Sequence, residues 1–122
     1  MKNSASIQIK GSGSEVSFVW QDFDGDDCFR DFHIDVIEDR VKKRFDFGAC
    51  AVYGLRKVAK FFRDATENCV SGGFRSPDLR LYDVTRISDG YLLSINSKTR
   101  GVSEHEVRSA SVQIDDEFLE QY

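Results

Sequence analysis

Apolar and polar residues alternate along the first part of the chain. The apolar positions of this pattern are Ile7, Ile9, Val16, Phe18, Trp20, Phe32, Ile34, Val36, Phe45, Phe47, Ala49 and Ala51. A period of two is typical of a half-buried β-strand, because successive side chains of a strand point to opposite faces of the sheet. The pattern therefore predicts four strands in a meander, with a flexible Gly/Ser turn at residues 11–14 and a tight turn within the charged stretch 38–44.

After Gly54 the spacing of the apolar residues changes to three and four. The new stripe consists of Leu55, Val58, Ala59, Phe62, Thr66 and Cys69, and the charged residues lie outside it. This spacing predicts an amphipathic helix that ends near Gly72 and Gly73, although no Ser, Thr or Asp cap marks its start. We expect one face of the helix to be buried against the sheet; the buried residues should include Leu55, Val58, Phe62, Cys69, Trp20, Phe47, Leu93 and Ile95.

Residues 78–96, DLRLYDVTRISDGYLLSIN, predict a β-hairpin. A two-residue Asp-Gly loop would place Arg86 opposite Leu93, with a charge beside the apolar face. A three-residue loop over residues 88–90 places Ile87 opposite Tyr91, and it gives the left-handed position to glycine. The three-residue loop is therefore the prediction.

Strands, one helix and strands again indicate an α+β protein. A last strand is expected at Ala110, Val112 and Ile114, followed by a helical turn from Asp115 or Asp116. Short connections favour antiparallel pairing, because parallel strands need long crossovers. We expect residues 1–122 to form a single α+β domain, a curled antiparallel β-sheet of about six to seven strands packed against one central amphipathic helix.

Composition narrows the class and the compartment. The chain has 122 residues, 40% of them hydrophobic and only one a proline, which excludes disorder for its bulk. Its first residues hold no continuous apolar segment, and no apolar run approaches the roughly twenty residues of a membrane helix. Three cysteines, an odd number without Cys-x-x-Cys spacing, suit neither a disulfide framework nor a zinc ribbon. We expect a cytoplasmic protein without membrane contact.

Candidate catalytic chemistry is sparse. His33 lies out of phase with the apolar positions of its strand, which predicts a place on the solvent face, and His105 lies between two glutamates in an expected loop. Cys28 and His33 are a conceivable thiol–imidazole pair, but no third group is indicated. Hydrolase, metalloprotease and phosphate-loop motifs are absent from the sequence. We expect neither an enzyme nor a cofactor.

The segment DFDGDDCFRDFH superficially resembles a calcium-binding loop, with Asp22, Asp24 and Asp26 at alternate positions. An EF-hand requires Gly at the sixth position and Glu at the twelfth, and here Asp27 and His33 occupy them. The EF-hand is therefore excluded, and no metal site is predicted. Two interpretations of this loop stay open: a weak calcium or magnesium site of another kind, or an acidic loop that binds no metal.

Charge is separated along the chain. Residues 22–39 carry a net charge of −7 and residues 40–63 a net charge of +7, while the whole chain carries −4. The acidic side chains of the first segment, which we take as the candidate partner-binding residues, are Asp22, Asp24, Asp26, Asp27, Asp31, Asp35, Glu38 and Asp39. Two interpretations stay open: the two segments neutralise each other internally, or the acidic residues bind a basic partner. The overall negative charge disfavours nucleic acid.

In size, acidity and order of elements the chain resembles the small cytoplasmic immunity proteins of bacterial polymorphic toxin systems, including contact-dependent growth inhibition. The resemblance rests on the short strands, the helix GLRKVAKFFRDATENC, the hairpin DLRLYDV and DGYLLSI, the strand SASVQI and the loop QDFDGDD. It implies stoichiometric binding of a cognate toxin domain, often a nuclease. It carries no residue roles.

Three functions follow as hypotheses. The first is a non-catalytic module that binds and neutralises a basic toxin domain through its acidic surface. The second is a small-molecule-binding or enzymatic domain with a pocket between sheet and helix. The third is a subunit of an assembly that associates through a strand edge or an apolar patch.

Overall fold

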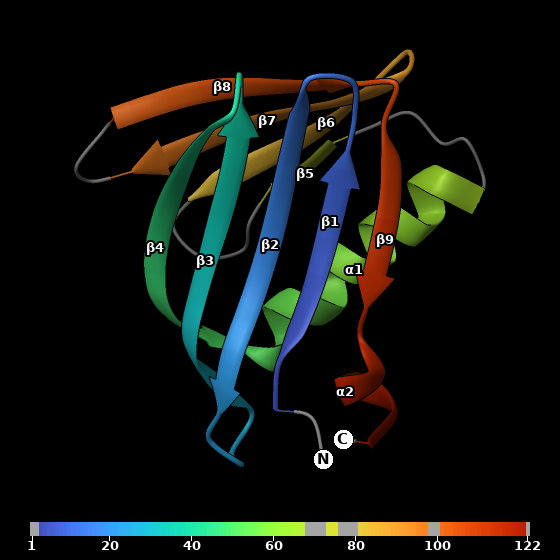
Figure 1. Ribbon diagram of the computed structural model, residues 1–122. Coiled ribbons are helices and arrows are strands. Elements are labelled where there is room, and N and C mark those ends of the chain that lie inside the picture. Colours follow the sequence, from blue (N-terminus) through green and yellow to red (C-terminus); the bar gives the residue numbers. More distant parts are fainter. Residues whose placement is uncertain (1–2, 68–72, 76–80, 98–100, 122) are drawn as a thin grey trace.

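The structure, a computed structural model, describes residues 3–67, 73–75, 81–97 and 101–121. Within these ranges the strands form two antiparallel sheets (Figure 1). The five-stranded sheet has the order β4-β3-β2-β1-β9 and comprises β1 (Ala5–Lys10), β2 (Ser14–Phe23), β3 (Cys28–Glu38), β4 (Val41–Ala51) and β9 (Ser111–Asp115). The four-stranded sheet has the order β5-β6-β7-β8 and comprises β5 (Gly73–Arg75), β6 (Tyr82–Ile87), β7 (Gly90–Ser97) and β8 (Gly101–Arg108). The helices are α1 (Val52–Glu67) and α2 (Glu117–Gln121).

The predicted meander is confirmed as strands β1 to β4. Burial alternates along β1 and β2 as the apolar period requires, and Val16, Phe18 and Trp20 have no exposed surface. The β3–β4 connection is a two-residue turn in which Asp39 and Arg40 have φ angles of 50° and 67°. Positive φ at both positions matches the twist of the flanking strands, so the charged stretch can reverse direction without glycine.

The helix is confirmed over Val52–Glu67, with a start two residues before Gly54, whereas its expected end near Gly72 lies outside the described residues. Leu55, Val58 and Phe62 are fully buried, whereas Cys69 lies outside the described residues. In place of a capping side chain, the carbonyl of Asp27 accepts a hydrogen bond from the backbone N–H of Val52 at 3.0 Å. This bond occupies one of the donors that every helix start leaves without an intrahelical partner.

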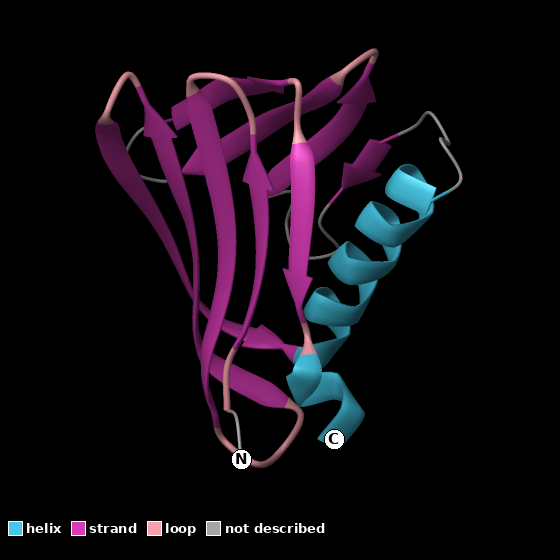
Figure 2. Cartoon of the chain, turned by 45° about the vertical axis from the view of Figure 1, so that its right-hand side comes forward, coloured by secondary structure: helices cyan, strands magenta, loops and turns pink. Residues whose placement is uncertain are grey.

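One hydrophobic core joins the two sheets and α1. The Phe18 ring of β2 lies 5.8 Å from that of Phe62 in α1 and 5.5 Å from that of Tyr82 in β6, between ring centroids. Trp20, Leu93 and Ile95 are buried as expected, whereas Phe47 is only partly buried at the edge of the core. Figure 2 shows α1 running from the lower end of the five-stranded sheet towards the four-stranded one. Neither described helix is long and apolar enough to cross a bilayer.

The predicted three-residue hairpin loop is wrong. Residues 88 and 89 form a two-residue loop, which pairs Ile87 with Gly90 and Arg86 with Tyr91. Gly90 is required by close approach, since a Cβ atom there would lie 1.8 Å from the carbonyl oxygen of Val107. The charge of Arg86 is accommodated because its guanidinium donates hydrogen bonds to the carbonyl of Ala65 and to the Tyr91 hydroxyl.

The α+β class is confirmed, but a single curled sheet is wrong. Strands β5 to β8 form their own sheet, and its edge strand β8 crosses the upper end of the five-stranded sheet (Figure 1). There the N–H of Ser12 donates to the carbonyl of Arg108 at 3.0 Å, and the Ser14 hydroxyl donates to that of Glu106 at 3.1 Å. These bonds tie the two sheets together at one end. The final strand and helical turn are present as β9 and α2.

Candidate functional site

The β2–β3 turn and the adjoining end of β2 present four carboxylates, which we call the acidic tip: Asp22, Asp24, Asp26 and Asp27. Its backbone is held by local hydrogen bonds, from Asp24 N–H to the Cys28 carbonyl at 2.9 Å and from Asp26 N–H to Asp24 Oδ1 at 2.7 Å. Together with the bond from the Val52 N–H to the Asp27 carbonyl, these contacts connect the backbone of the turn to β3 and to the start of α1. The four aspartates are therefore carried by a hydrogen-bonded backbone.

All four side chains of the acidic tip are exposed. Within the described part of the chain no ion pair is found for any of them, and the nearby Arg30 is exposed as well. The tip also has an acidic neighbour that the sequence did not indicate. The Phe23 ring of β2 lies 4.5 Å from that of Phe118 in α2, which brings the exposed Glu117 to the same end of the molecule.

The acids of β3 behave differently, because the structure pairs them internally. Asp35 is 9% exposed and accepts two hydrogen bonds from Arg44, at 2.8 and 3.2 Å, with the Lys42 ammonium 3.6 Å away. Burial alone would raise the pKa of Asp35, but the Arg44 hydrogen bond and the charges of Arg44, His33 and Lys42 hold that pKa below its ordinary value. Internal neutralisation thus applies to Asp35 and not to the acidic tip.

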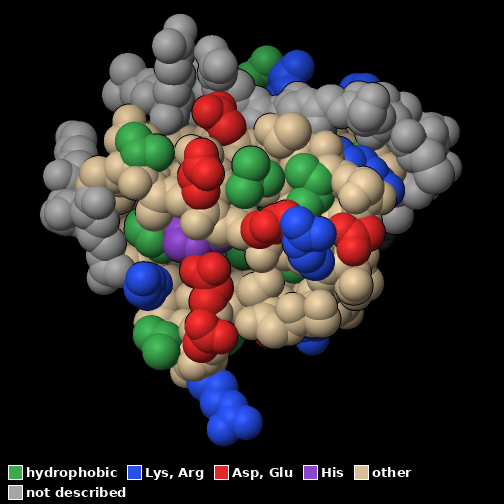
Figure 3. All heavy atoms as spheres, turned by 90° about the horizontal axis from the view of Figure 1, so that it is seen from above, with side chains coloured by type: hydrophobic (Ala, Val, Ile, Leu, Met, Phe, Trp, Pro, Cys, Tyr) green, Lys and Arg blue, Asp and Glu red, His purple; other side chains and the backbone are tan. Residues whose placement is uncertain are grey.

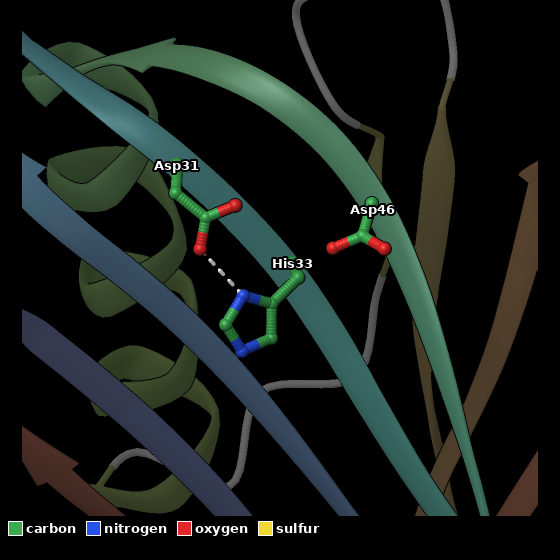
Figure 4. A group of neighbouring side chains, drawn as sticks. All are labelled: Asp31, His33 and Asp46. Carbon is green, nitrogen blue, oxygen red and sulfur yellow. Dashed lines mark hydrogen bonds and ion pairs between the residues drawn. The ribbon is translucent and has the colours of Figure 1, made fainter.

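The expected exposure of His33 is wrong, although its face is correct. His33 lies on the outer face of the sheet, opposite the core, yet it is only 2% exposed. His33 lies on the interior strand β3, where its cross-strand partners are Val19 on β2 and Asp46 on β4. Nδ1 donates to Asp31 Oδ2 at 2.7 Å, and Nε2 lies 3.7 Å from Asp35 Oδ2 (Figure 4 shows the Asp31 contact). The neighbouring side chains therefore cover the imidazole.

His105 is not in a loop but in β8, where it is 5% exposed. Its Nδ1 donates to Glu38 Oε1 at 2.6 Å, and its Nε2 lies 3.0 Å from the Ser103 hydroxyl. The ring also meets that of Phe45 edge-on, at 5.9 Å between centroids. His105 therefore joins β8 to the ends of β3 and β4, and Glu38 is a structural partner of this histidine.

The end of the molecule crossed by β8 is also partly acidic. Figure 3 shows acidic side chains in a row there, with Lys or Arg side chains nearby. The exposed acids of this end include Asp39, Glu104 and Glu106, and Arg108 lies 2.7 Å from Glu106. Negative charge at this end is therefore partly compensated, in contrast to the acidic tip.

Neither thiol chemistry nor a pocket between sheet and helix is developed in the described residues. The Cys28 thiol donates to the Phe29 carbonyl at 3.4 Å, and His33 is hydrogen-bonded to Asp31 instead. Cys50 is half-buried, and Cys69, expected to be buried, lies outside the described residues. A hollow of about 390 Å³ lies between the β6–β7 hairpin and β9, lined by Arg86, Asp89, Gly90, Tyr91, Ala110, Ser111 and Val112.

The arrangement thus separates two groups of acids. The carboxylates of the acidic tip are exposed and have no ion-pair partner among the described residues, whereas Asp31, Asp35 and Glu38 are hydrogen-bonded to side chains. No family model, curated protein or solved structure matches this chain, so any function assigned to the two groups rests on their own chemistry.

Proposed function

We propose that this chain is a non-catalytic protein-binding module that binds a basic bacterial toxin domain and neutralises it, as an immunity protein does. The observation that carries the proposal is the acidic tip, four exposed carboxylates without an ion-pair partner in the described residues. Like charges held close together repel one another, and a basic protein surface would relieve that repulsion. The tip is a site for such a partner, and neither membrane nor nucleic acid is required.

The hydrogen-bonded backbone of the acidic tip adds to this support. A loop that is ordered before binding loses little conformational entropy in the complex. Its field also steers a positively charged partner and speeds association, most strongly at low ionic strength. Glu117, which is also exposed, lies at the same end of the molecule.

The experiment replaces all four tip aspartates by asparagine. Asparagine preserves the shape and the acceptor oxygen that Asp24 offers to the Asp26 N–H, so the turn should persist. The matched control neutralises the exposed acids of the opposite end: Asp39→Asn, Glu104→Gln and Glu106→Gln. The partner is the protein that co-purifies stoichiometrically from the producing cell, and its affinity is measured for all three proteins at two salt concentrations.

We expect the tip variant to bind at least about tenfold more weakly, or roughly 1.4 kcal/mol, with a nearly unchanged melting temperature. Affinity of the unmodified chain should fall as salt rises, and the tip variant should show a smaller salt dependence. Equal affinity of tip variant and parent would refute the acidic tip as the binding surface. Loss in the control alone would move the interface to β8. Loss in neither would favour the exposed basic residues of α1, which are Arg56, Lys57, Lys60 and Arg63.

A second, catalytic function is favoured by one observation. Ser103, His105 and Glu38 form a hydrogen-bonded chain in which the imidazole contacts the hydroxyl through Nε2 and the carboxylate through Nδ1. This is the order of nucleophile, base and orienting acid in serine hydrolases. Covalent labelling by an alkyl fluorophosphonate, lost in Ser103→Ala, would support that candidate. Absence of labelling in the parent protein would mean that the hydrogen bonds between Ser103, His105 and Glu38 only link the two sheets.

A further inference from the structure

Three potential metal ligands converge on the outer face of the five-stranded sheet. Asp31 and His33 are two residues apart on β3, and Asp46 is the cross-strand partner of His33 on β4. In the described part of the chain they form a cluster in which one ligand atom from each lies within 4.8 Å of the other two. Figure 4 shows both carboxylates flanking the imidazole.

We propose that Asp31, His33 and Asp46 bind a divalent transition-metal ion of the zinc class. Two carboxylate oxygens and one imidazole nitrogen form a mixed ligand set, which suits zinc and its neighbours better than the all-oxygen sites of calcium and magnesium. Three protein ligands leave at least one position for water or for a ligand from a partner. This site is separate from the acidic tip and does not depend on the proposed function.

The surroundings of His33 match those of a metal-ligating histidine. Such a histidine commonly directs its second ring nitrogen to a carboxylate, which fixes the ring and its tautomer. Here Nδ1 faces Asp31 at 2.7 Å, and Nε2 faces Asp35 at 3.7 Å. A bound ion takes the place of the proton between Nδ1 and Asp31, and the remaining ring proton on Nε2 then points to Asp35. Arg44 holds Asp35 in place through two hydrogen bonds.

The geometry needs only a small adjustment. Metal–ligand distances of about 2.0–2.2 Å correspond to separations of roughly 3–3.5 Å between neighbouring ligand atoms. His33 is almost completely buried and Asp31 is hydrogen-bonded to it, so this half of the site is already formed. Asp46 is exposed, and its side chain is therefore free of packing that would prevent it from closing by about an ångström. Metal binding would link β3 to the edge strand β4.

The test uses Zn²⁺ alone, titrated into the full chain after removal of metals by a chelator. Only two histidines are present, so the ring nitrogen signals of His33 and His105 can be followed separately by NMR, with His105 as an internal control. Calorimetry gives the stoichiometry and affinity for the parent, for Asp46→Asn and for the matched control Asp26→Asn. Circular dichroism checks that both variants fold.

We expect one Zn²⁺ per chain, a shift of the His33 nitrogen signals and no comparable shift for His105. Asp46→Asn should weaken binding at least about tenfold, whereas Asp26→Asn should change it less than about twofold. The absence of saturable binding would overturn the proposal, as would binding that leaves the His33 signals unchanged. Equal affinity of Asp46→Asn and the parent would exclude this ligand set and leave the cysteines or His105 as the source of binding.

Discussion

Replacement of Phe62 by alanine tests the central packing of the molecule. Phe62 is completely buried, and its ring contacts one ring in each sheet, Phe18 at 5.8 Å and Tyr91 at 5.2 Å between centroids. Removal of a buried phenylalanine side chain costs about 3–5 kcal/mol, because apolar contacts are lost and a cavity remains. Because Phe62→Ala removes contacts to both sheets, we expect a cost near the middle of this range, about 4 kcal/mol.

Urea denaturation measures this cost. The single tryptophan, Trp20, is buried against Phe32 at 4.9 Å, so its fluorescence reports the loss of the core. Phe61→Ala is the matched control; Phe61 is only half-buried, and its change should cost less than half as much. A loss below about 1 kcal/mol for Phe62→Ala, with an unchanged slope in urea, would refute the common core of helix and sheets.

Two further substitutions test local features. Gly90→Ala should destabilise the protein by about 2–3 kcal/mol, because the new Cβ would meet the Val107 backbone. Gly25→Ala is the control; its Cβ would lie in open space at a φ of 88°, and the change should cost about 1 kcal/mol. Equal costs in urea denaturation would contradict the close approach at Gly90. Asp35→Asn should lower stability at neutral pH, and its difference from the parent should narrow as pH falls below about 4. The sign follows from the lowered pKa of Asp35, which stabilises the fold only while the carboxylate is ionised. A pH-independent difference in thermal melts would contradict it.

Local periodicity predicted the meander and α1 because each buries one regular face. It identified the face of His33 correctly but not its burial, since alternation assigns a side chain to a face and does not show what covers it. On a central strand the neighbours at Val19 and Asp46 provide that cover. A turn placed at Asp39 and Arg40 would have fixed the β3–β4 register and revealed the pairing of His33 with Asp46.

The four-stranded sheet was harder to predict because its inward positions are partly polar. In β8 the inward residues include Ser103 and His105, which satisfy each other and Glu38 across the junction of the sheets. Such long-range partners leave no periodic signal in the sequence. Composition alone identified the acidic tip as a charged loop. It did not show that Arg44 pairs with Asp35 on β3 and not with the tip, because that depends on the register of β3 and β4.

The pairing of β1 with β9 has a consequence for the order in which the sheet can form. Lys10 and Ser111 are joined across 101 positions, so closing that loop costs roughly 4 kcal/mol of chain entropy by the logarithmic dependence on length. On a ribosome, β1 can pair with β2 at once, but its other edge waits until the last strand has been synthesised. During that interval the edge of β1 offers unpaired backbone groups to any extended segment nearby. Pairing of β9 with β1 thus ends the period in which this edge is open to intermolecular strand addition.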